Sequence, residues 1–244
     1  YKALGTFATT LYEKQCLNNE QYFLDKTPRY YYIIPEILKI FPTAKFIFLF
    51  RNPVHVMSSM IQTWSNGNLK NMYAYERDLN YGPKVLSYGY ELLKDKAYAI
   101  CYEEYVTNPE KYTKEICNYL ELEFDETMLN SFIIQNTKGR MGDPSGVKEY
   151  KSISISSLSK WKKTFDNTFR KNMIYKYIEC MDSNVLEIQG YKKEEILNEI
   201  KSFDVKNSFA FKDRTDFLYS NLVRIIKPNI WFGETTKKWA SSRF

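Results

Sequence analysis

Arg51 and Ser59 are the two residues whose types and spacing could bind a phosphate group. They flank the start of an expected helix in the stretch KFIFLFRNPVHVMSSM, residues 45–60. Asn52 is a good helix N-cap and Pro53 suits the first helical position. Free backbone N–H groups and the helix dipole would then favour an anion at this point, and the planar guanidinium of Arg51 would add a fork suited to phosphate. The alternative is that Arg51 pairs with a carboxylate and that Ser59 is a surface residue.

The elements that must position these two residues are a strand and a helix. The run from Phe46 to Phe50 contains no polar residue, which is typical of a strand buried on both faces between helices. A buried piece of helix is the alternative, but Pro42 and Pro53 bound the run and keep it short. After the turn, apolar residues recur at helical spacing: Val56, Met57, Met60, Ile61 and Trp64. The segment therefore predicts a strand, a tight turn and a helix.

A second strand and helix repeat this arrangement farther along the chain. The stretch YAICYEEY, residues 98–105, is a second strand candidate, and Asn108 with Pro109 is expected to open a helix. Strands that alternate with helices predict an α/β fold with a parallel sheet. Further helices are expected near residues 1–23, 35–41, 84–95, 156–165, 168–181 and 213–226, and residues 134–150 are expected to form a long loop.

Composition narrows the classes of partner. The chain has 244 residues and a net charge of +6, a mild excess that suits an anionic cofactor or substrate without requiring nucleic acid. No RNA-binding signature accompanies the many tyrosines and phenylalanines, so we expect no nucleic-acid partner. No apolar run approaches the ~20 residues of a membrane span, and no signal peptide is visible.

Cysteine and histidine usage argues against a metal site and against disulfides. Cys16, Cys101, Cys117 and Cys180 show no C-x-x-C spacing, so free thiols in a reducing, cytoplasmic compartment are expected. His55 is the only histidine. A zinc site of histidines and cysteines is therefore not expected, and a Ser-His-Asp triad would have to use His55. We expect His55 to be a helix-surface residue instead.

Three motifs in order resemble the sulfotransferase family, whose members use 3′-phosphoadenosine 5′-phosphosulfate (PAPS). These are DKTPRY at residues 25–30, the stretch FPTAKFIFLFRNPVHVMSSM and the stretch YEEYVTNPEKY. The pattern is most similar to that of bacterial and Golgi-type members. The resemblance covers roughly residues 5–190, and no single motif carries it alone.

The resemblance implies a role for several residues. Arg51 and Ser59 match the arginine and serine that grip the 3′-phosphate, and Lys26 matches a lysine near the transferring sulfuryl group. Tyr102 matches a tyrosine that borders the adenine. A family loop of the form K-G-x-x-G-D resembles the stretch that begins with Lys138, Gly139 and Arg140, although this stretch lies closer to Tyr102 than the loop does in cytosolic members.

The resemblance also implies a P-loop-like, three-layer fold with a central parallel sheet between helices. The family's first strand and its glycine-rich 5′-phosphosulfate loop are not recognisable. The stretch GTFATT, residues 5–10, instead reads as part of a helix. We therefore expect residues 1–190 to form an N-terminally truncated sulfotransferase-like domain and residues 191–244 a helical, basic and aromatic C-terminal extension. The strand before Arg51 would then have an open edge, and this chain alone is expected to transfer no sulfate.

The function implied is transfer of the sulfuryl group of PAPS, without a metal, to a hydroxyl or amine of a small-molecule or glycan acceptor. Carbohydrates, lipids and secondary metabolites are all compatible, and no catalytic base is evident. A catalytically inactive module that binds an anionic ligand or a partner is the alternative. A P-loop kinase is disfavoured because no G-K-[ST] is present. The C-terminal extension could shape the acceptor pocket, dock a partner or touch a membrane, and the oligomeric state is not predicted.

Overall fold

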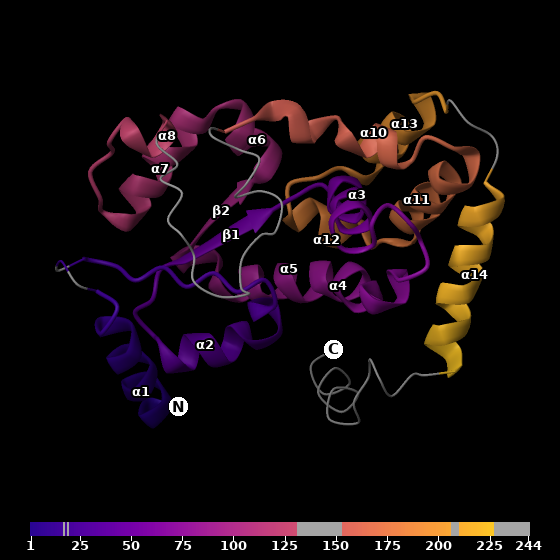
Figure 1. The fold of residues 1–244 in the computed structure, drawn as a ribbon. Helices are drawn as coiled ribbons and strands as arrows, with labels where there is room; N and C mark the ends of the chain where they lie inside the picture. Colours follow the sequence, from indigo (N-terminus) through magenta and orange to yellow (C-terminus); the bar gives the residue numbers. More distant parts are fainter. Residues whose placement is uncertain (17, 19, 131–152, 206–209, 227–244) are drawn as a thin grey trace.

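The computed structural model describes residues 1–16, 18, 20–130, 153–205 and 210–226, and the fold in this part of the chain is mostly helical (Figure 1). In chain order its elements are α1 (Lys2–Glu13), η1 (Tyr30–Ile33), α2 (Ile34–Ile40), β1 (Phe46–Phe50), α3 (Pro53–Trp64), η2 (Met72–Ala74), α4 (Glu76–Asn80), α5 (Gly82–Leu93), η3 (Lys94–Lys96), β2 (Ala97–Cys101), α6 (Tyr102–Thr107), α7 (Pro109–Leu120), α8 (Thr127–Asn130), η4 (Ile155–Leu158), α10 (Lys160–Thr164), α11 (Thr168–Cys180), α12 (Ser183–Ile188), α13 (Lys193–Ser202) and α14 (Phe211–Ile226).

Strands β1 and β2 form a parallel pair, with Phe46 opposite Ala97 and Phe50 opposite Cys101. Helices lie on both faces of the pair. On one face the ring of Tyr90 from α5 lies 5.4 Å from that of Phe48, and on the other the hydroxyl of Tyr98 donates to Glu115 of α7 at 2.7 Å. The predicted α/β class with a parallel sheet flanked by helices is confirmed, and it is compatible with a P-loop-like fold.

The expectation that β1 is buried on both faces is wrong. Phe48 and Phe50 are buried, whereas Ile47 is 39% and Leu49 is 55% exposed. In a strand, alternate residues point to opposite faces, so the apolar run has one buried face and one open face. Among the described residues only β2 pairs with β1, and the run of apolar residues could not reveal how little of the described chain covers the side chains of Ile47 and Leu49.

Two element boundaries also differ from the expectation. Strand β2 ends at Cys101, and Tyr102 to Glu104 already belong to α6. The stretch GTFATT lies within α1, as predicted, but this helix ends at Glu13. Gly5 is needed where α1 meets α2, because a Cβ added to it would lie 2.7 Å from the carbonyl oxygen of Ile40.

The larger hydrophobic core joins α3 to the C-terminal half of the described chain. Its buried members include Val54, Met57 and Ile61 of α3, Trp161 of α10, and side chains of α11, α12 and α13. Trp161 is 2% exposed and belongs to this core, so it anchors α10 to it. At the far end, Arg170 of α11 pairs with Asp213 at 2.7 Å and so ties α14 to the body. The division of the chain at residue 190 into a domain and an extension stays a prediction.

Within the part of the chain that the structure describes, no helix is both long enough and apolar enough to cross a membrane.

The two faces of β1 predict opposite responses to truncation. Phe48→Ala should lower the free energy of unfolding by about 3–5 kcal/mol, because it removes a buried ring and leaves a cavity. Leu49→Ala should cost less than about 1 kcal/mol, since its side chain is already half exposed. Urea denaturation of both variants measures this difference, and equal losses would mean that another part of the protein covers the outer face of β1.

Candidate functional site

The carboxyl ends of β1 and β2 bring Arg51 and Tyr102 together. Parallel strands end at the same edge of a sheet, and ligands of open α/β sheets bind outside that edge. The Arg51 guanidinium lies 4.4 Å from the centroid of the Tyr102 ring, a cation–π distance. The Tyr102 hydroxyl is in turn 3.0 Å from Oγ of Ser157 in η4. The Tyr102 ring therefore packs on one face of the guanidinium, and the contact of its hydroxyl with Ser157 holds the ring in place.

Arg51 has a polar atom that the described residues do not satisfy. Its Nε is shielded from solvent and has no hydrogen-bond partner in the described part of the chain, where no carboxylate forms an ion pair with Arg51. A buried donor without an acceptor is costly, and in a native structure it calls for an explanation such as an unseen ion or ligand. The contact on Tyr102 stabilises the charge but supplies no acceptor. An anionic ligand would supply one.

The turn that follows Arg51 has the predicted helix cap. The Asn52 side chain accepts a hydrogen bond from the backbone N–H of Val54 at 2.9 Å, and Pro53 occupies the first turn of α3. The cap satisfies one of the free N–H groups at the helix start. The others, together with the helix dipole, keep this end of α3 favourable for negative charge.

Glu103 of α6 accepts three hydrogen bonds, which come from this turn, from α3 and from the segment after α12. Its Oε1 accepts from the backbone N–H of Asn52 at 3.1 Å and lies 2.9 Å from Nδ1 of His55, and its Oε2 accepts from the Tyr191 hydroxyl at 2.6 Å. Burial alone would raise the pKa of Glu103, but the hydrogen bonds from His55, Tyr191 and the backbone outweigh it and hold the pKa below its usual range. Glu103 is therefore an ionised acceptor near neutral pH.

Tyr191 reaches Glu103 because the chain turns sharply after α12. Gly190 has a φ of +86°, a conformation that suits glycine, and a Cβ at this position would lie 3.0 Å from Sγ of Cys101. Burial and the contact with Glu103 both raise the pKa of the Tyr191 hydroxyl, so it stays a donor. Nothing in the sequence near Tyr191 indicates a contact with a residue 88 positions earlier.

The sequence model of the sulfotransferase family matches residues 3–126, just over half of the chain. The chain belongs to the sulfotransferase family. No curated protein and no solved structure matches it. The matched range contains Lys26, Arg51, Ser59 and Tyr102. Residues from 127 onward lie outside the match, so what is said of them depends on the structure alone.

For this sulfotransferase-family chain, the expected position of His55 is wrong. His55 is 7% exposed, not a surface residue, and its ring stacks on that of Trp161 at 6.4 Å between centroids. Its position in the first turn of α3 faces the core because the larger core packs on this side of the helix. His55 thus occupies a structural place, wedged between the Glu103 carboxylate and the indole.

The two neighbouring serines of α3 differ in their surroundings. Ser58 is buried, and its Oγ lies 2.7 Å from Oγ1 of Thr164. Ser59 is half-buried, and its hydroxyl takes part in no hydrogen bond within the described residues. Its hydroxyl is therefore available to a ligand, but no contact in the structure connects it to Arg51.

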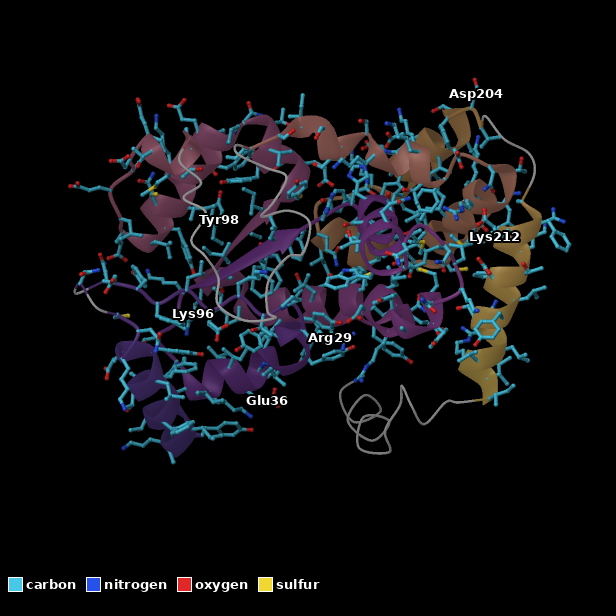
Figure 2. All side chains as sticks on the ribbon, viewed as in Figure 1. Arg29, Glu36, Lys96, Tyr98, Asp204 and Lys212 are labelled. Carbon is cyan, nitrogen blue, oxygen red and sulfur yellow. The ribbon has the colours of Figure 1, made fainter. Side chains whose placement is uncertain are left out.

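The segment that carries Lys26 is held in place from both sides. The Asp25 carboxylate accepts from the hydroxyls of Tyr12 at 2.6 Å and Tyr30 at 2.7 Å, and Arg29 pairs with Asp78 at 2.6 Å. Figure 2 shows Arg29 near the stretch formed by α4 and α5. Lys26 itself is exposed, and no described contact joins it to Arg51 or Tyr102.

The structure does not test the remaining predicted site residues. Lys138, Gly139 and Arg140 lie outside the described residues, so their role stays a prediction. Two surface hollows lie elsewhere, one over the start of α7 and one between α1 and α2. In the described part of the chain no group of His, Cys, Asp and Glu could hold a metal ion, and all four cysteines are free.

The Glu103 cluster predicts a specific loss of stability in acid. A carboxyl group whose pKa is lowered in the folded state stabilises the protein at pH values above its pKa in the unfolded state, which is about 4.3. This contribution disappears as the pH falls through the pKa of the folded state. Wild type should therefore be more stable than Glu103→Gln at pH 6–7, and the gap should close below about pH 4. Urea denaturation across this range measures the gap, and a gap that does not change with pH would contradict the prediction.

Proposed function

We propose that this protein is a PAPS-dependent sulfotransferase that acts on a hydroxyl or amine acceptor. The observation that carries the proposal is the unsatisfied Nε of Arg51 at the end of β1, in a chain of the sulfotransferase family. Arg51 is aligned on Tyr102 and has no carboxylate partner among the described residues, so its fork is available for a dianionic phosphate.

The residues divide by the part of PAPS that each would meet. Arg51 and Ser59 would hold the 3′-phosphate, and Tyr102 would border the adenine with the ring edge or face that Arg51 leaves free. Lys26 would lie near the transferring group, and Lys138, Gly139 and Arg140 would add charge and backbone donors. Bound PAPS supplies the sulfuryl group, and the chain's own residues bind and orient it.

The acceptor class is proposed only broadly, as a small molecule or glycan that presents a hydroxyl or amine. Carbohydrates, lipids and secondary metabolites remain candidates. We propose a cytoplasmic location because the four thiols are free.

A non-catalytic binding module is the second candidate, and one observation favours it. Within the described residues, β1 has an open edge opposite β2, and no glycine-rich loop beside it offers N–H groups to a 5′-phosphosulfate. Such a protein would bind the 3′-phosphate end of the nucleotide and transfer nothing.

The cofactor assignment predicts a loss of affinity at Arg51. Arg51→Ala should weaken binding of 3′-phosphoadenosine 5′-phosphate by about 2–4 kcal/mol, since a charge-assisted pair is lost. Calorimetry should show little change for adenosine 5′-phosphate, which lacks the 3′-phosphate. Lys45→Ala is the matched control, because it removes one positive charge at the opposite end of β1, where Lys45 pairs with Glu121. Equal wild-type affinity for the two nucleotides would sink the assignment.

Turnover separates the enzyme from the binding module. Lys26→Met should lower kcat about a hundredfold through the loss of electrostatic stabilisation, with the affinity for 3′-phosphoadenosine 5′-phosphate nearly unchanged. The measurement is transfer of radiolabelled sulfate from PAPS to a panel of hydroxyl and amine acceptors. Transfer by wild type to any acceptor would overturn the expectation that this chain alone transfers no sulfate. Tight nucleotide binding with no transfer would favour the binding module for this chain.

A further inference from the structure

We propose that Glu103 is the positioning residue that holds Arg51 ready for the 3′-phosphate. The inference rests on the proposed function and adds to it a residue that makes no contact with the nucleotide. Glu103 lies at the start of α6, directly after Tyr102, and its carboxylate receives three hydrogen bonds from two distant parts of the chain.

The first of these bonds fixes the backbone of Arg51. The peptide unit between Arg51 and Asn52 is planar, so the bond from the Asn52 N–H to Glu103 also sets the orientation of the Arg51 carbonyl group. The next residue back along α6, Tyr102, supports the Arg51 guanidinium from one face. Two consecutive residues of α6 thus hold the backbone and the side chain of the same arginine.

The other two bonds fix Glu103 itself. Nδ1 of His55 donates to Oε1, because an ionised carboxylate can only accept, and His55 is wedged in place by Trp161. The Tyr191 hydroxyl donates to Oε2 from the turn after α12. These donors fix the direction in which the carboxylate points. Among the described residues no ion pair joins Glu103 to Arg51, so the guanidinium is available for a phosphate.

The experiment measures discrimination, defined as the ratio of the affinities for 3′-phosphoadenosine 5′-phosphate and adenosine 5′-phosphate. Glu103→Gln keeps the shape of the side chain but replaces one acceptor oxygen with a donor group. It should reduce discrimination about tenfold or more, the scale of a hydrogen bond to a charged group. Glu104→Gln is the matched control, because Glu104 is the exposed neighbour whose carboxylate accepts from Tyr112 of α7 and has no described contact with Asn52 or His55, and it should leave discrimination unchanged.

A purely structural role for Glu103 would lower the melting temperature without changing this ratio. In the Arg51→Ala background, Glu103→Gln should have no further effect on discrimination, since both act through the same guanidinium. If Glu103→Gln does not fold, Tyr191→Phe removes one bond from the carboxylate and should still lower discrimination severalfold.

The outcomes separate this inference from the proposed function. If wild type discriminates between the two nucleotides and both Glu103→Gln and Tyr191→Phe discriminate equally well, the positioning role is overturned and the cofactor assignment stands. If wild type does not discriminate, the cofactor assignment fails and the positioning role fails with it.

Discussion

The parallel pairing of β1 with β2 is the constraint on which the site depends. Because both strands end at the same edge, two residues 51 positions apart in the chain become neighbours, and the turn into α3 lies beside the start of α6. The pair is short and has one open face, so its stability rests on the buried side, where Phe48 and Phe50 meet α5. The stability of this small core and the geometry of Arg51 are therefore linked.

Arg51, the Asn52 cap and the second strand could be predicted from the sequence because each is specified by neighbouring residues. An apolar run that ends in Arg-Asn-Pro predicts a strand, a cap and a helix start without knowledge of anything distant. The exposure of Ile47 and Leu49 could not be predicted in this way. It depends on which elements cover the strand, and an apolar run looks the same whether one face is covered or both.

The residues that the sequence did not reveal are those whose partners lie far away in the chain. Glu103 lies within a stretch that resembles a family motif, but its three hydrogen bonds come from positions 52, 55 and 191. The one available signal was a carboxylate directly after a parallel strand, since that edge of the sheet gathers polar groups. His55 shows the same limit, because its burial comes from Trp161, which packs on α3 from more than a hundred residues away.

The arrangement of charges explains why a carboxylate so close to Arg51 does not neutralise it. The sequence left two alternatives for this arginine, a phosphate ligand or a carboxylate partner, and Glu103 is the acidic residue that binds the backbone of the turn directly after Arg51. Its oxygens are already taken by a backbone N–H, an imidazole and a phenol, and these bonds keep it ionised without use of the guanidinium. The hydrogen bonds around Glu103 therefore stabilise the turn, and they hold the carboxylate in a direction in which it forms no ion pair with Arg51 among the described residues.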